Sequence, residues 1–129
     1  MERVVRAFPV LEGKRDQLER FLQELTTTRD QETSAFYRKY GVVRESAFLQ
    51  KTAHGEILIV VTDLDAVEAA FSTYGASQEK FEAWFKECVR EFSGIDLNAD
   101  PRGPHAQCLL DWKVEESNGG HVPKTLHDR

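Results

Sequence analysis

Residues 42–62, VVRESAFLQKTAHGEILIVVT, contain the pattern that decides the fold. Two β-rich stretches, 42–50 and 56–62, flank the segment Thr52-Ala53-His54-Gly55, whose composition is typical of a hairpin turn. The stretch 56–62 is almost wholly apolar, which predicts a central strand covered on both faces. We therefore expect an antiparallel strand pair inside a larger sheet.

Two further stretches have the composition of strands. Residues 3–11, RVVRAFPVL, precede the hairpin, and residues 105–114, HAQCLLDWKV, follow it much later in the chain. Both alternate in character and are rich in β-favouring residues. The sequence thus predicts four strands.

Helical spacing fills the two long connections between these strands. Apolar residues recur at helical spacing over residues 18–40, but Thr26-Thr27-Thr28 interrupt them. One helix, bent near the threonines, is our preferred interpretation, and two helices meeting there are the alternative. After the hairpin we expect a short helix ending near Tyr74 and a longer amphipathic helix over 81–92.

The expected order of elements is β-α-β-β-α-β. Because crossover connections are right-handed, few topologies remain for this order. The commonest is the ferredoxin-like sandwich, an α+β fold in which a four-stranded antiparallel sheet carries its helices on one face.

Length and charge limit the class of protein. The chain has 129 residues and a net charge of -5, which favours one domain and argues against nucleic-acid binding, since phosphates require a basic surface. We predict a domain over residues 1–114 and a polar, disordered tail over 115–129. The chain has no stretch typical of a membrane span or signal peptide, so we expect a cytoplasmic protein without a membrane partner.

Strand alternation divides the sheet residues into two faces. We expect one apolar set to lie under the helices, with Glu45 as its one charge: Val5, Ala7, Val43, Ala47, Leu49, Cys108, Leu110 and Trp112. The opposite face would expose the apolar residues Val4, Phe8, Val10, Phe48 and Leu109. Exposed apolar patches usually mark interfaces, so we predict a homodimer through this face. A monomer with a half-solvated sheet is the alternative.

Charged and aromatic residues on this framework are candidates for ligand binding. Glu45 would need a partner beneath the helices, and Arg29 in the polar part of the first helical region could provide it. Arg6 could pair with Asp111 or bind an anionic ligand. Trp84 and Trp112 are first of all core residues, but they could also wall a pocket between helix and sheet.

Several features resemble the dimeric α/β-barrel superfamily, and within it a small bacterial family of unknown function. They are Glu45 and Phe48 on one strand, Gly55 leading to Leu58, the segment FEAWFKEC at 81–88, and Asp96-Leu97. The resemblance covers residues 3–113. It implies two ferredoxin-like subunits packed sheet to sheet. Members of the wider superfamily include cofactor-free monooxygenases, haem-degrading enzymes, isomerases, peroxidases and ligand binders, so the fold does not imply one chemistry.

No catalytic, metal or cofactor motif is present in the sequence, and we expect no cofactor and no metal site. The leading hypothesis is a protein that binds a small apolar or aromatic ligand. One alternative is a cofactor-free monooxygenase- or isomerase-like enzyme with an aromatic substrate, in which Glu45 would be the base. The other is a protein interaction module.

Overall fold

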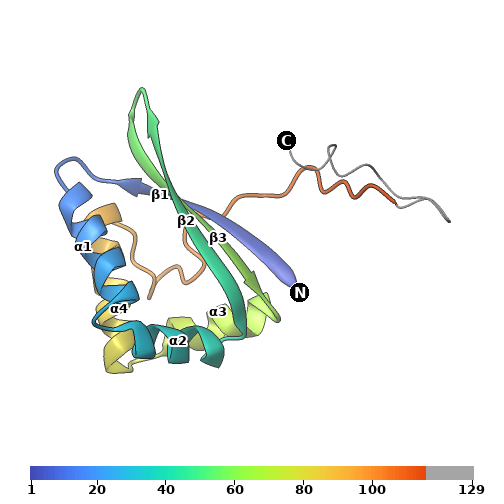
Figure 1. Cartoon of the computed structure of the whole chain (residues 1–129), viewed down its shortest axis with the longest axis horizontal. Coiled ribbons are helices and arrows are strands. Elements are labelled where there is room, and N and C mark those ends of the chain that lie inside the picture. Colours follow the sequence, from blue (N-terminus) through green and yellow to red (C-terminus); the bar gives the residue numbers. More distant parts are fainter. Residues whose placement is uncertain (116–129) are drawn as a thin grey trace.

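The computed structural model describes residues 1–115 of the chain, so the predicted tail over 115–129 lies, apart from Glu115, outside the described residues. Within this part the chain forms three strands and four helices (Figure 1). In chain order they are β1 (Glu2–Val10), α1 (Arg15–Thr26), α2 (Asp30–Lys39), β2 (Val42–Thr52), β3 (Gly55–Leu64), α3 (Val67–Ala76) and α4 (Lys80–Ser93). The α+β class, the central hairpin and the two helices after it are confirmed.

The sheet has three antiparallel strands in the order β1-β3-β2. The predicted four-stranded ferredoxin-like sheet, and the dimeric α/β barrel built from it, is therefore wrong. The segment 105–114, which was predicted to be the fourth strand, pairs with the sheet only through an antiparallel bridge between His105 and Arg6. Beyond it the chain leaves the sheet, and Trp112 is 80% exposed. β1 is at the edge of the sheet and is free to pair, but the chain bonds to it only from Pro104 to Ala106 and then diverges. Alternation thus predicted an extended segment correctly but carries no information on whether it pairs.

The region after β1 forms two helices where a single bent helix was preferred. The threonines cause the break, because their hydroxyls compete for carbonyl groups of the preceding turn. Thr26 donates to Leu22 O at 3.0 Å, and Thr27 donates to Gln23 O at 2.6 Å. Arg29 N then bonds to Glu24 O, and α2 begins in a new direction at Asp30. The polar centre of this region is thus an inter-helix turn.

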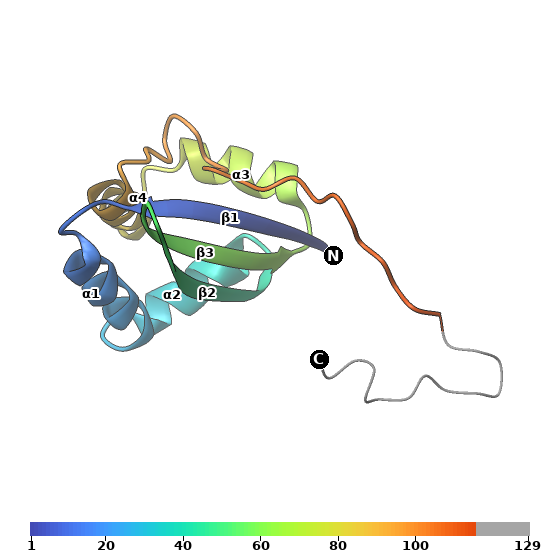
Figure 2. The same cartoon turned by 90° about the horizontal axis from the view of Figure 1, so that it is seen from above.

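All four helices lie on one side of the sheet (Figures 1 and 2). We name that side of the sheet the inner face, and the side without helices the outer face. On β1 the prediction of faces is wrong: Val4, Phe8 and Val10 are buried on the inner face, whereas Ala7 is exposed on the outer face. The error arose because β1 is apolar on both sides, so its alternation alone does not tell which side is covered.

On β2 the faces are as predicted for Glu45, Ala47 and Leu49, which pair with the inner-face residues of β3. An irregularity between Val42 and Arg44 shifts the register, so Val43 turns outward and is 62% exposed. Such a bulge reverses which side of the sheet a residue faces, and it cannot be predicted from the alternation of apolar and polar residues in the sequence.

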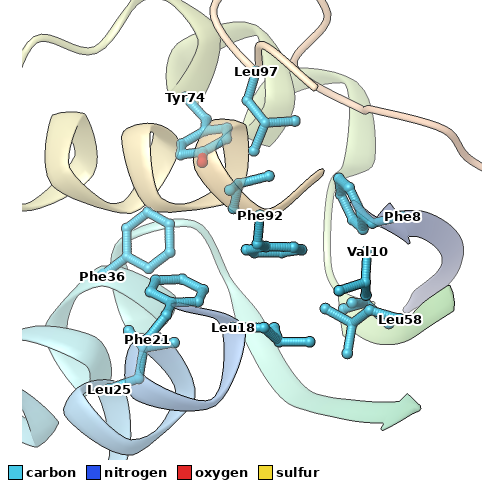
Figure 3. Packing of buried hydrophobic residues seen from close by; sticks show 12 residues of the cluster. Phe8, Val10, Leu18, Phe21, Leu25, Phe36, Leu58, Tyr74, Phe92 and Leu97 are labelled. Atoms are coloured by element: carbon cyan, nitrogen blue, oxygen red, sulfur yellow. The ribbon is translucent and has the colours of Figure 1, made fainter. Parts of the chain in front are cut away.

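The core lies between the inner face and the helices. Figure 3 shows Phe8 and Val10 of β1 near Phe92 of α4, with Phe21 of α1 beside it. Phe21 and Phe85 meet edge to face with centroids 5.0 Å apart. Aromatic pairs of this geometry add to the stability gained from burial alone. This aromatic layer fixes the helices at one end of the sheet.

Candidate functional site

Three neighbouring strands place polar side chains together on the inner face. Arg6 comes from β1, Thr62 from β3 and Glu45 from β2, where Glu45 and Thr62 are cross-strand partners. The Thr62 hydroxyl donates to Glu45 Oε1 at 2.7 Å, and Arg6 Nη2 lies 3.4 Å from the same oxygen. The Tyr37 hydroxyl of α2 donates to Glu45 Oε2. These four residues form a polar cluster beneath the helices.

Arg6 is held in an unusual setting for a cation. Its side chain is 9% exposed, and its guanidinium lies 5.4 Å from the Phe8 ring centroid and 5.5 Å from that of Phe71. Its Nε is buried without a hydrogen-bond partner among residues 1–115. The free-energy cost of burying this donor is therefore not offset by a hydrogen bond within the described residues.

Two tyrosines provide hydroxyl groups near Arg6. Burial and the adjacent Glu45 raise the pKa of Tyr37 well above its ordinary value. Burial likewise raises the pKa of Tyr74. Both phenols therefore stay protonated and can donate a hydrogen bond. The Tyr74 hydroxyl is buried and has no partner in the described part of the chain.

A cavity of about 270 Å³ lies beside this cluster. Its polar end is formed by Arg6, Glu45 and Tyr37, and Thr26 and Thr33 line it where α1 gives way to α2. The rest of its wall is apolar: Phe8, Phe21, Leu22, Leu25, Ala47, Leu58, Val60, Phe85, Val89, Phe92 and Leu97.

A smaller pocket of about 40 Å³ shares part of this wall. Arg6, Tyr37, Glu45 and Phe85 line both, and Tyr74 lines only the small one. The small pocket has room for about one polar group, given that a water molecule occupies roughly 30 Å³ in the liquid. The site is thus an apolar chamber with a narrow polar end.

The structure brings together two of the five predicted site residues, Arg6 and Glu45. Arg29 instead pairs with Glu32 at 3.3 Å and lies 4.1 Å from the ring centroid of Trp84. The expected pair of Arg29 with Glu45 is therefore replaced by the pair of Arg6 with Glu45.

The two tryptophans lie outside the site. Trp84 packs on Phe21 and lines neither pocket. Trp112 lies on the exposed segment that follows the bridge between Arg6 and His105. Sequence reasoning missed Tyr37, Thr62 and Tyr74. A usable signal was present for the tyrosines, because each adds a hydroxyl to an apolar helical stripe that must find a partner once buried.

Comparisons with known protein families, curated proteins and solved structures found no match. In the described residues, no group of three or more His, Cys, Asp and Glu side chains could hold a metal ion. Within the same part of the chain, the helices are too short or too polar to cross a membrane. The site itself is therefore the basis for a functional proposal.

Proposed function

We propose that this protein binds a small molecule in the cavity between the inner face and the helices. The observation that carries the proposal is a buried arginine with an unpartnered Nε at the end of an apolar chamber of about 270 Å³. Ligand sites are typically apolar chambers with a few placed polar groups. This chamber is near the lower end of their usual size, roughly 300 Å³, so the ligand must be small.

The lining favours a neutral aromatic ligand that carries a carbonyl oxygen. Arg6 Nε and the Tyr74 hydroxyl are buried donors without a described protein partner, and both residues line the small pocket. A carbonyl oxygen in that pocket would supply the acceptor that both donors lack. A carboxylate is less suitable, because Glu45 already places a negative charge beside Arg6. The aromatic part would lie among the rings and aliphatic side chains of the larger cavity.

Binding without catalysis suits this geometry better than an enzyme. Both oxygens of Glu45 already accept hydrogen bonds, from Thr62 and Arg6 on one side and from Tyr37 on the other. To take a proton from a substrate, the carboxylate would have to break one of these bonds.

Calorimetry with acetophenone and ethylbenzene tests the proposal, since the two probes have similar shapes and differ in the carbonyl group. We expect the wild-type protein to bind acetophenone at least about fivefold more tightly, as one hydrogen bond to a buried donor is worth about 1 kcal/mol. Tyr74→Phe should reduce that preference and leave ethylbenzene binding unchanged. Equal weak binding of both probes by the wild type and the variant would contradict the proposal.

We further propose a cytoplasmic homodimer that associates through the outer face. This face presents the apolar residues Val5, Phe48, Ile57, Ile59 and Val61. Phe48 is 56% exposed, and the four helices leave this side of the sheet uncovered. The face supports association because burying contiguous apolar surface is favourable.

A further inference from the structure

The segment that follows the bridge between Arg6 and His105 is exposed to solvent along its whole described length. Ala7 N donates to Pro104 O at 3.0 Å, and Ala106 N donates to Val5 O at 2.7 Å. Then the chain departs, and Figures 1 and 2 show it running away from the body of the domain. We name residues 107–115 the arm.

The arm exposes large apolar side chains to an extent that is unusual for a soluble protein. Leu109 is 87% exposed, Leu110 78% and Trp112 80%. Neither apolar cluster of the domain includes an arm residue. Three such residues in four positions form an apolar strip that favours burial against another surface.

The outer face offers a matching surface. Ala7, Ile59 and Phe48 are aligned across the three strands, and Val5 and Val61 form the next row. The arm leaves the sheet at the edge of this face, beside Val5. One chain therefore carries an uncovered apolar face and, next to it, an uncovered apolar segment.

The length and the charge of the arm also match the outer face. Nine extended residues span about 30 Å at roughly 3.3 Å per residue, which is close to the length of one strand of this sheet. On the outer face, Arg3 already pairs with Asp63 at 2.7 Å. Arg44 forms no ion pair among residues 1–115 and is opposite in sign to Asp111 on the arm. An arm that lies along the sheet can thus bury its apolar residues while its acid meets a cation.

We propose that the arm of one copy packs on the outer face of a second copy, and that the second copy's arm does the same in return. The start of the arm borders Arg3 and Val5 of its own chain, yet Leu109 stays 87% exposed and Trp112 80%. Its own sheet therefore leaves these side chains uncovered, which favours a second copy as the surface that covers them. A twofold arrangement gives both copies identical contacts, so the interface closes at two chains. This inference rests on the proposed homodimer, adds the element that builds its interface, and is independent of ligand binding.

Trp112 provides a direct test in the full chain. Trp84→Phe leaves Trp112 as the single tryptophan, because the sequence has two. We expect its emission maximum to lie at shorter wavelength in the dimer and to shift to longer wavelength as dilution produces monomers. Trp112→Asp should raise the dimer dissociation constant at least about tenfold, since it buries an unpaired charge. Ser34→Asp, which adds the same charge at an exposed position of α2 on the helical side, is the matched control and should change the dissociation constant little.

Cross-linking of mixed chains tests which copy the arm contacts. One chain keeps Cys108 and carries Cys88→Ser, and the other carries Ser46→Cys on the outer face with both native cysteines changed to serine. A short bis-maleimide should join these two different chains into a covalent pair. Pairs of like chains only, or a dimer in which Trp112 keeps the emission of an exposed indole, would overturn the arm's role and leave the homodimer standing. A full-length monomer would overturn both, whereas acetophenone binding would be unaffected.

Discussion

At the scale of single residues, Glu82 on α4 is a carboxylate placed almost wholly inside the protein. Its side chain is 2% exposed, and it accepts hydrogen bonds from Lys39 Nζ at 2.8 Å and from the Tyr40 hydroxyl. Burial acts to raise the pKa of Glu82, but these hydrogen bonds outweigh it and hold the pKa below its ordinary value of 4.5. Glu82 is therefore ionised and joins α4 to the end of α2.

Glu82→Gln should lower the free energy of unfolding by about 1–3 kcal/mol near neutral pH, because a charge-assisted buried bond is lost. Since folding lowers the pKa of Glu82, its stabilisation is fully present above the unfolded value and is lost as pH falls through the folded value. The difference between wild type and variant should thus shrink on acidification, as measured by urea unfolding. Glu79→Gln is the control: its side chain is 66% exposed beside the same lysine, and it should cost under about 0.5 kcal/mol. A difference that grows on acidification would contradict the assignment.

Strand alternation found the two charges of the site but not their surroundings. Glu45 was placed correctly under the helices, because it alternates in step with Ala47 and Leu49 on the same strand. Its partner was predicted wrongly as Arg29. The choice between Arg29 and Arg6 depends on how α2 lies over the sheet, and periodicity carries no information on that. Thr62 was missed because a threonine is ordinary in a buried strand.

At the scale of elements, α3 depends on a close approach to the loop after α4. A Cβ on Gly75 would lie 2.4 Å from Pro101 Cγ and 3.1 Å from Pro101 Cβ, and the proline ring cannot turn away. This contact holds the loop whose end bonds to β1 through Pro104. The sequence had placed Gly75 only at the end of a short helix, since the Pro101 contact is long-range.

The contact with Pro101 determines whether Gly75→Ala raises or lowers the stability of the protein. In a helix free of contacts, alanine is more stable than glycine by about 1 kcal/mol. Here the overlap with Pro101 should make the variant less stable than wild type by about 1–3 kcal/mol. Thermal unfolding measures the change, and the double variant with Pro101→Ala should recover most of the loss. A stabilised Gly75→Ala protein would show that α3 and the loop are not in contact.

The division of residues 15–39 into two helices matters at the same scale. A single helix would have covered the sheet with one continuous apolar stripe. The turn at Thr26–Arg29 instead redirects α2, so Tyr37 reaches Glu45 while Thr26 and Thr33 line the cavity. The polar interruption was visible in the sequence, but the competition of threonine hydroxyls for backbone carbonyls decided how it folds.

At the scale of the whole molecule, the outer face and the cavity lie on opposite sides of one thin sheet. Each strand therefore has an apolar residue toward the helices and another toward the proposed partner, as in Leu58 and Ile59 of β3. This explains why β3 is almost wholly apolar although helices cover one side only. It also explains why the predicted uncovered apolar face was assigned mostly wrong residues: Phe48 lies on the outer face, but Val4, Phe8 and Val10 are buried on the inner face.

Phe48→Asp tests the proposed homodimer at its centre. Phe48 lies opposite Ile59 on the outer face, where a carboxylate would be buried without a cation if two copies associate there. We expect light scattering to give a dimer mass for the wild type and a monomer mass for the variant at the same micromolar concentration. The monomer should keep its fold and bind acetophenone, because Phe48 lines neither pocket. Ser34→Asp, on an exposed position of α2, adds the same charge and should remain dimeric. If the variant stays dimeric, the interface must lie elsewhere than on the outer face. An unpaired carboxylate buried at position 48 would cause a large loss of affinity.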